Sequence, residues 1–228
     1  MGLLDILFLK RCINCGKVGK YFCDCCRSTI QVIEPNEAIC PICEHPAIGG
    51  AVHPRCRTRY MLDGLTSFFH YEGAIRKAIK AIKYRLVSDI AQEYISLIAP
   101  GSLTQVTRQL RSTSVLVPIP LHASRYRERG FNQAEVLGRI LARRLKIPMR
   151  TDILRRTKNT TAQVEMKKRE DRLKNMKNVF TVSSTASMGQ AHIFLFDDVF
   201  TTGATMRAAA SSLRRSGVSF VWALTLAR

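Results

Sequence analysis

An apolar tetrad that ends in two adjacent carboxylates is the feature that most constrains how this chain folds. Ile193 to Phe196 is apolar, Asp197 and Asp198 follow, and a Thr-Thr-Gly-Ala-Thr turn occupies residues 201–205. The tetrad predicts a buried strand of a parallel sheet, and residues 206–215 predict a helix. The polar turn then falls at the carboxyl end of a strand, where open α/β sheets bind ligands.

The residue types of this turn favour a phosphorylated ligand that also carries hydroxyl groups. Gly203 lets the backbone approach an anion, the threonine hydroxyls donate hydrogen bonds, and N–H groups at the helix start point at a phosphate. Asp197 and Asp198 repel a phosphate, and they suit hydroxyl groups or a magnesium ion on the same ligand. The sequence therefore predicts a ligand with a phosphate and a diol, such as a ribose 5-phosphate.

The same run resembles the phosphoribosyl-pyrophosphate (PRPP) motif of type I phosphoribosyltransferases. An Asp-Asp pair that caps a helix beside a Thr-rich turn is the structural alternative. The phosphate loops G-x-x-x-x-G-K-[ST] and G-x-G-x-x-G are absent from the sequence. The resemblance implies catalytic roles for Asp197 and Asp198, and PRPP binding by Val199, Phe200, Thr201, Thr202, Gly203, Ala204 and Thr205.

Charge indicates polyanionic partners. The net charge is +19 over 228 residues, and residues 143–177 carry thirteen Lys or Arg against four acidic residues. Such an excess is typical of proteins that bind nucleic acid or phosphorylated ligands. A solubilising face is the alternative. Aromatic residues are sparse in this basic segment, which weakens the case for base stacking in a nucleic-acid groove.

We expect a cytoplasmic protein without a membrane span. No segment is apolar over the length that a bilayer requires. Leu3 to Leu9 is apolar but short, with no basic residues before it and no small-residue cleavage site after it, which argues against a signal peptide. In the cytoplasm, thiols stay reduced.

All eight cysteines lie before residue 57, which predicts a domain boundary at about residue 60. Pairs of ligands at x-x spacing can reach one tetrahedral ion from a single tight turn, and two such pairs complete a site. We therefore expect residues 1–60 to form a double zinc-ribbon module with two structural zinc ions. The ligands would be Cys12, Cys15, Cys23 and Cys26 for one ion and Cys40, Cys43, His53 and Cys56 for the other.

Several alternatives remain open within this module. Cys25 could displace Cys23 or Cys26, and His45 could compete with His53. Sequential pairing is favoured, but spacing also permits a cross-braced arrangement. Disulfides would require an oxidising compartment that nothing in the sequence supports.

Residues 61–228 predict a parallel sheet, because strands and helices alternate. Pro118 indicates a strand end or an irregular sheet edge. Residues 100–113 read as a polar linker, residues 120–130 as a loop, and residues 151–181 as a polar, basic segment with hairpin-like ends. Strands are expected at 65–71, 115–119, 193–196 and 220–226, and helices at 73–84, 89–98, 132–145 and 206–215.

Two basic segments suggest parts of a ligand site. Three arginines within residues 125–129, followed by a glycine and a helix start, could cradle a pyrophosphate. The segment from residue 155 to 175 could form a mobile lid over the substrate, with an exposed hairpin as its alternative. The candidates are Arg125, Arg129, Asn132 and Gln133 for the pyrophosphate loop, and Arg156, Gln163, Arg172 and Asn175 for the lid.

With these residues, nearly the whole chain resembles the ComF family of competence-associated proteins. The resemblance rests on the paired knuckles, Lys83-Tyr84, the run 129–133 and the terminal motif, together with the spaced lid residues. It implies a type I phosphoribosyltransferase-like parallel sheet flanked by helices in residues 61–228. It also implies magnesium-PRPP as ligand, and a role in handling or uptake of single-stranded DNA and in nucleotide metabolism. Competence-machinery proteins would be further partners. His53 in place of a cysteine and the extra Cys25 depart from the pattern.

Two functions follow from this interpretation. The chain is either a phosphoribosyltransferase or a non-catalytic PRPP sensor or DNA-binding competence factor. The motif would be intact in both cases. Residues 65–84, which would form a hood over a nucleobase, carry no pattern that names an acceptor, so catalysis is only slightly favoured.

Overall fold

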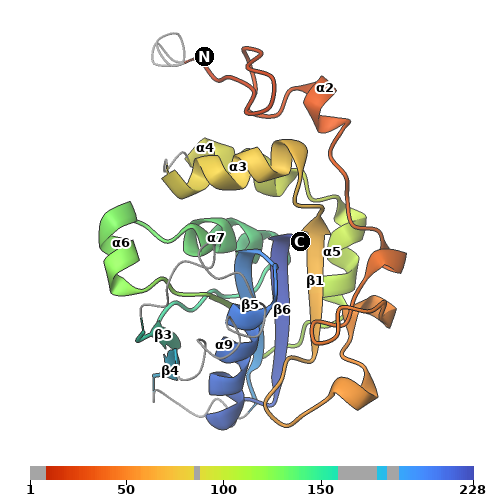
Figure 1. The fold of residues 1–228 in the computed structure, drawn as a ribbon, viewed down its shortest axis with the longest axis vertical. Helices are drawn as coiled ribbons and strands as arrows, with labels where there is room; N and C mark the ends of the chain where they lie inside the picture. Colours follow the sequence, from red (N-terminus) through yellow and green to blue (C-terminus); the bar gives the residue numbers. More distant parts are fainter. Residues whose placement is uncertain (1–8, 85–87, 159–178, 184–189) are drawn as a thin grey trace.

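The computed structural model describes residues 9–84, 88–158, 179–183 and 190–228. Its centre is a parallel four-stranded sheet in the order β1-β6-β5-β2 (Figure 1). The strands are β1 (Gly64–Phe69), β2 (Ser114–Pro118), β5 (His192–Val199) and β6 (Phe220–Ala227). Their carboxyl ends meet at one edge of the sheet, because all four run in the same direction.

Helices cover both faces of this sheet, and the strand sequences explain why. Phe194 and Phe196 lie in one hydrophobic cluster, whereas Ile193 and Leu195 lie in the other. Successive side chains of a strand point to opposite faces, so a continuous apolar strand needs cover on both sides. The chain is therefore an α/β protein. The first face carries α3 (Gly73–Tyr84), α4 (Ser88–Ser96) and α7 (Gln133–Leu145), and the second carries α9 (Ala204–Arg215).

Strand β2 lies at an edge of the sheet and ends at Pro118, as the proline indicated. Strand β5 is longer than the predicted tetrad and continues through Val199. Asp197 and Asp198 therefore belong to the strand itself. By alternation, Asp198 falls on the face of Phe194 and Phe196, and Asp197 falls on the opposite face.

Two segments expected to be irregular are helical. Residues 100–113 were predicted as a linker, but α5 (Pro100–Thr107) begins with a proline at its first position, where proline is tolerated, and buries Val106. Residues 120–130 were predicted as a loop, but α6 (Ala123–Arg129) is capped by the His122 side chain at its start and ends at Gly130, whose φ of 75° is left-handed. Neither helix shows apolar periodicity in the sequence, and only α6 has a side-chain cap.

The basic segment begins and ends as a hairpin. Strands β3 (Leu154–Arg156) and β4 (Phe180–Val182) pair antiparallel, which agrees with the predicted hairpin-like ends. The lid residues Gln163, Arg172 and Asn175 lie outside the described residues.

The amino-terminal region has little regular structure. It contains α2 (Asp24–Arg27) and the 3₁₀ turns η1 (Pro35–Glu37), η2 (Ile48–Gly50) and η3 (Pro54–Cys56). The part around α2 lies above α3 and α4, whereas the part from η1 to η3 runs beside β1 (Figure 1). Between the two parts, the Ile33 N–H donates to the Phe68 carbonyl of β1 at 2.9 Å. The two halves of this region thus pack against different elements. The predicted boundary near residue 60 stays a prediction.

None of the helices in the described ranges combines the length and the apolar character that crossing a membrane would need.

Candidate functional site

A cavity of about 690 Å³ opens at the carboxyl end of the sheet. It lies where β2 and β5 end and where α9 begins, which is the position that parallel α/β sheets use for ligands. Most of the predicted site residues line it. These are Asp197, Asp198, Val199, Phe200, Thr201, Gly203, Ala204, Thr205, Arg125, Arg129, Asn132, Gln133 and Arg156.

The carboxylate pair at the end of β5 is joined to helix α3. Lys83 Nζ lies 3.0 Å from Asp198 Oδ2, and the side chains of the two residues are 27% and 7% exposed. Burial alone would lower the pKa of Lys83, but the Asp198 carboxylate outweighs it and raises that pKa. Lys83 therefore stays charged and neutralises Asp198.

Asp197 binds its proton more tightly than an ordinary carboxyl group does. Burial, and then the negative charge of Asp198, raise the pKa of Asp197 to about 8, although the Asp198 N–H donates to Asp197 Oδ1 at 2.9 Å. At neutral pH the pair carries about one negative charge, which Lys83 balances. The two carboxyl groups can therefore accept and donate hydrogen bonds to ligand hydroxyls without an added cation.

The loop between β5 and α9 has the geometry of an anion cradle. Gly203 has a φ of 66°, and a Cβ there would lie 2.5 Å from Phe200 Cζ, so only glycine fits. Gly203 is also the N-cap of α9 and has no side chain to cap it. Gly203, Ala204 and Thr205, at the start of this twelve-residue helix, line the cavity, and the N-terminus of a helix favours an anion. Thr202 does not line the cavity, and its buried Oγ1 has no hydrogen-bond partner in the described structure.

Helix α6 brings the arginines together. Arg125 and Arg129 are four residues apart, so they lie on one face of the helix, and both line the cavity. Arg129 Nη1 donates to Gln133 Oε1 at 3.1 Å, which orients its guanidinium. Glu128 also lines this wall. This is a cationic wall opposite the carboxylate pair, and it came from a segment predicted as a loop.

Asn132 is occupied by structural hydrogen bonds. Its Oδ1 accepts from the Ala134 N–H at 3.1 Å and caps α7, and its Nδ2 donates to the Ile119 carbonyl at 3.0 Å. The residue is 7% exposed. Asn132 thus anchors α7 to the end of β2, and both polar atoms of its side chain already make hydrogen bonds within the protein.

Arg156 is the one member of the predicted lid within the described ranges. It lies in β3, lines the cavity, and stands 5.6 Å over the Phe180 ring. Burial, and then the positive charge of Arg125, lower the pKa of Arg156. Two guanidinium groups therefore approach the same part of the cavity, and an anion there would relieve their repulsion.

Tyr71, Lys80 and Lys83 also line the cavity, from the segment in which the sequence named no ligand. Lys80 and Lys83 are three residues apart and share a helix face. That spacing was visible in the sequence, but nothing local indicated that this face turns toward β5. The sequence therefore predicted a basic helix but could not predict that this helix contacts Asp198.

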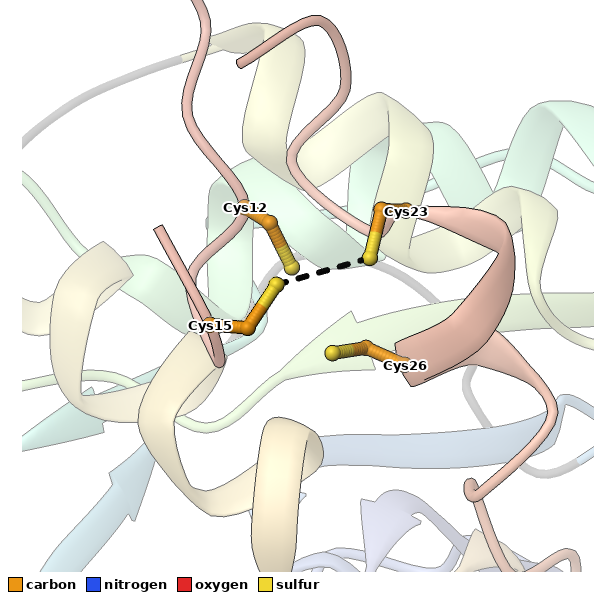
Figure 2. Close-up of side chains that lie close together, drawn as sticks. All are labelled: Cys12, Cys15, Cys23 and Cys26. Carbon is orange, nitrogen blue, oxygen red and sulfur yellow. Dashed lines mark hydrogen bonds between the residues drawn. The ribbon is translucent and has the colours of Figure 1, made fainter. Parts of the chain in front are cut away.

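The first cysteine-rich group, formed by Cys12, Cys15, Cys23 and Cys26, could hold a zinc ion. The four ligand atoms lie within 4.8 Å of one another, and the sulfurs converge from two turns of the chain (Figure 2). Cys15 Sγ and Cys23 Sγ are 3.6 Å apart. Tetrahedral zinc with bonds of about 2.3 Å to sulfur separates its sulfurs by about 3.8 Å, so the donor set fits zinc.

The second group, formed by Cys40, Cys43, His53 and Cys56, also fits zinc. His53 Nδ1 lies 3.3 Å from Cys43 Sγ, and Nε2 lies 3.0 Å from the Pro46 carbonyl. A proton on Nε2 would donate to that carbonyl and leave Nδ1 as the ligand atom, which is the usual outer contact of a metal-bound histidine. The arrangement brings together ligands of sequential pairs. It joins neither His45 nor Cys25 to a group, and both residues are exposed.

The two groups repeat the same knuckle. The Gly16 N–H donates to the Cys12 carbonyl at 2.8 Å, and the Glu44 N–H donates to the Cys40 carbonyl at 2.9 Å. Both residues have left-handed φ angles, 79° for Gly16 and 63° for Glu44. Such a turn aims two side chains at one ion.

Each group supports a different wall of the cavity. Glu93 of α4 accepts the Tyr21 and Phe22 N–H groups at 3.2 and 2.7 Å, and Lys77 of α3, the helix that carries Lys83, donates to the Asn14 carbonyl at 3.0 Å. Arg207 of α9 donates to the Pro41 and Ile42 carbonyls of the second group at 3.2 and 3.4 Å. The cysteine-rich region therefore buttresses the cavity from two sides.

The fold and these sites define an α/β protein with two cysteine-rich metal-site candidates and a cationic cavity at the carboxyl end of a parallel sheet. Comparison with known proteins gives the family. The chain is 32% identical to Competence protein ComFC of Bacillus subtilis over 208 residues, which cover 88% of this chain and 81% of that protein. It belongs to the ComF family.

The chain is also similar to two further proteins. Competence protein F of Haemophilus influenzae is 37% identical over 123 residues, and this match spans 54% of the chain and about half of that protein, 53%. The DNA utilization protein YhgH of Escherichia coli K12 is 28% identical over 210 residues, 89% of each chain. No family model matches the sequence.

Proposed function

We propose that this chain is a phosphoribosyltransferase-type protein whose cavity binds PRPP, and that residues 61–228 form its phosphoribosyltransferase-like domain. The observation that carries the proposal is the convergence of the β5–α9 loop, the Asp197–Asp198 pair and the arginines of α6 on one cavity. The loop leads into the N-terminus of α9, which favours a 5-phosphate, and the carboxyl groups suit the ribose hydroxyls. The arginines suit a pyrophosphate, which prefers planar, bidentate donors.

The reaction proposed for such a ligand needs positioning more than a protein nucleophile. The bond from C1 of the ribose to a pyrophosphate oxygen breaks, and its electron pair leaves with the pyrophosphate. The acceptor then forms the new bond to C1. Positive charge develops on the ribose ring, and the buried Asp198 carboxylate stabilises it electrostatically while Arg125 and Arg129 hold the leaving group. The lid residues would exclude water.

Metal ions have separate roles in this proposal. Zinc in the two cysteine-rich groups would be structural, because four protein ligands leave no open position. Magnesium would enter on the pyrophosphate, since Lys83 already balances the carboxylate pair. When bound, magnesium would neutralise the oxygens of the leaving group.

The biological setting is proposed from the family. Relatives are named for competence and for DNA utilization, and the net charge of +19 favours a polyanionic partner. We therefore propose a cytoplasmic role in handling incoming single-stranded DNA, linked to nucleotide metabolism and to proteins of the competence machinery. A non-catalytic PRPP sensor or DNA-binding factor is the second candidate, and the relatives' names, which refer to competence and to DNA utilization, favour it.

Release of pyrophosphate from PRPP tests the enzyme. Purified protein is incubated with magnesium-PRPP and with nucleobases, amines or oligonucleotides as acceptors. Acceptor-dependent release that disappears in Asp198→Asn supports the transferase. PRPP binding by calorimetry without release for any acceptor supports the sensor, and absence of binding contradicts both.

A further inference from the structure

Arg207 connects the second cysteine-rich group to the loop that precedes α9. Its Nη1 donates to the Pro41 carbonyl at 3.2 Å and to the Ile42 carbonyl at 3.4 Å. Its Nη2 donates to the Thr202 carbonyl. One guanidinium therefore contacts carbonyls of two segments that are far apart in the sequence.

This connection joins a turn that carries two metal-ligand candidates to the loop that lines the cavity. Pro41 and Ile42 are the residues between the ligands Cys40 and Cys43, so an ion held by those thiolates would fix the direction of their carbonyls. At the other end, the Thr202 carbonyl belongs to the peptide unit that contains the Gly203 N–H.

A trans peptide points its carbonyl and its N–H in opposite directions. Holding the Thr202 carbonyl on the side of Arg207 therefore holds the Gly203 N–H on the other side. Gly203 lines the cavity and is the most conformationally free residue of the loop. A contact outside the loop is what such a peptide needs in order to keep a single orientation.

We propose that Arg207 is a positioning residue through which the metal of the second cysteine-rich group orders the anion-binding loop. Metal and phosphate ligand then bind cooperatively, and the coupling is reciprocal. The inference rests on the proposed function, in which this loop binds the 5-phosphate. The first cysteine-rich group contacts α3 and α4 instead, through Lys77 and Glu93.

Arg214 of the same helix is the matched control. Its Nε donates to the Met61 carbonyl at 3.2 Å, Nη1 donates to the Val218 carbonyl at 3.4 Å, and the guanidinium pairs with Asp63. Arg214 thus also ties α9 to the preceding chain, but at the end of the helix remote from the loop. Its loss removes a comparable set of structural contacts without touching residue 202.

The experiment compares Arg207→Gln, Arg207→Lys and Arg214→Gln in the zinc-loaded full chain. Ribose 5-phosphate is titrated by calorimetry, and hydrogen exchange of the peptide covering residues 200–205 is measured without ligand. We expect Arg207→Gln to weaken binding by about tenfold, within the usual range of coupling between sites, and to accelerate exchange. Arg207→Lys keeps one donor for the Thr202 carbonyl and should recover part of the affinity and part of the protection from exchange. Arg214→Gln should bind ribose 5-phosphate within about twofold of the wild-type affinity.

Zinc release supplies a readout that does not depend on turnover. Ribose 5-phosphate should slow the release of zinc to a chelator from the wild type and leave the rate in Arg207→Gln unchanged. Equal affinities and equal loop exchange in Arg207→Gln and wild type would overturn the inference. If the wild type does not bind ribose 5-phosphate, the proposed function fails. Hydrogen exchange of residues 200–205 in Arg207→Gln and in metal-depleted protein then still tests whether the metal orders the loop. Exchange equal to that of the zinc-loaded wild type would count against this coupling.

Discussion

Lys83 and Asp198 form an ion pair of 3.0 Å between helix α3 and the end of strand β5. The pair joins the segment that would cover an acceptor to the carboxylates that would hold the ribose. It also places a cation beside the nearly buried Asp198 side chain, at the wall of the cavity. Several consequences can be measured.

Lys83→Gln should destabilise the protein by about 1–3 kcal/mol, because it leaves a nearly buried carboxylate without its partner. Asp198→Asn in the same chain should recover much of that loss, and urea denaturation of the four proteins gives the coupling energy. Lys80→Gln is the matched control on the same helix face, and we expect it to change the free energy of unfolding by less than about 0.5 kcal/mol. Additive effects of the two changes would show that the pair contributes no interaction energy.

The pKa of Asp197 predicts a pH dependence of stability. The pKa of about 8 in the folded chain lies above the ordinary value of 3.8, so the folded protein binds the proton more tightly than the unfolded chain does. The stability from this proton is complete below about pH 4 and is lost as pH rises toward 8. Between pH 5 and 7, the Tm of the wild type should therefore fall relative to that of Asp197→Asn by roughly 5–10 °C. Parallel Tm profiles for the two proteins would contradict the assignment of a raised pKa.

Asp197→Asn combined with Asp198→Asn should abolish PRPP binding, because the contacts to the ribose hydroxyls are lost together. Calorimetry with magnesium-PRPP measures this, and a drop of about a hundredfold, or about 3 kcal/mol, is expected for the loss of one charge-assisted and one neutral hydrogen bond. Inorganic pyrophosphate should still bind, because it meets the arginines. Unchanged PRPP affinity would remove these carboxylates from the site.

Native mass spectrometry should find two zinc ions per chain. Cys26→Ser and His53→Ala should each lose one ion or bind it weakly, because three ligands remain. Cys25→Ser, next to Cys26, and His45→Ala, between Cys43 and His53, are the matched controls, and they should retain both ions, since neither side chain joins a group. Loss of an ion in either control would show that the ligand sets are different.

Neutralising Lys167, Lys168 and Arg169 should weaken binding of single-stranded DNA, although these residues lie outside the described structure. Three lost phosphate contacts should reduce the slope of log affinity against log salt by about 2. Arg59, Arg108 and Arg139 are exposed and lie outside the basic segment, and replacing them with Gln removes the same charge as a control. If both triple variants show the wild-type slope, this basic segment is not the DNA-binding surface.

Much of the fold was predictable because local patterns carried it. The run Ile193 to Phe196 predicted a strand buried on both faces, and Phe194 and Leu195 do enter opposite clusters. The x-x spacings predicted groups of four ligands. The errors lay in polar sequence, where Pro100 and His122 begin helices that apolar periodicity did not reveal. Those helices depend on caps and on packing, which contribute weakly to a sequence pattern.

The sequence by itself determined which chemical groups the chain can present: a carboxylate pair with a Thr-Gly turn after a strand, arginines at a four-residue spacing, and two sets of thiol and imidazole ligands. These follow from local order, which a short stretch of chain carries. Only the tertiary structure decided that Lys83 pairs with Asp198, that Asn132 donates to the Ile119 carbonyl, and that Arg207 links Ile42 to Thr202. Such contacts join residues distant in sequence, and their energies depend on burial and distance, which exist only once the helices have packed on the sheet.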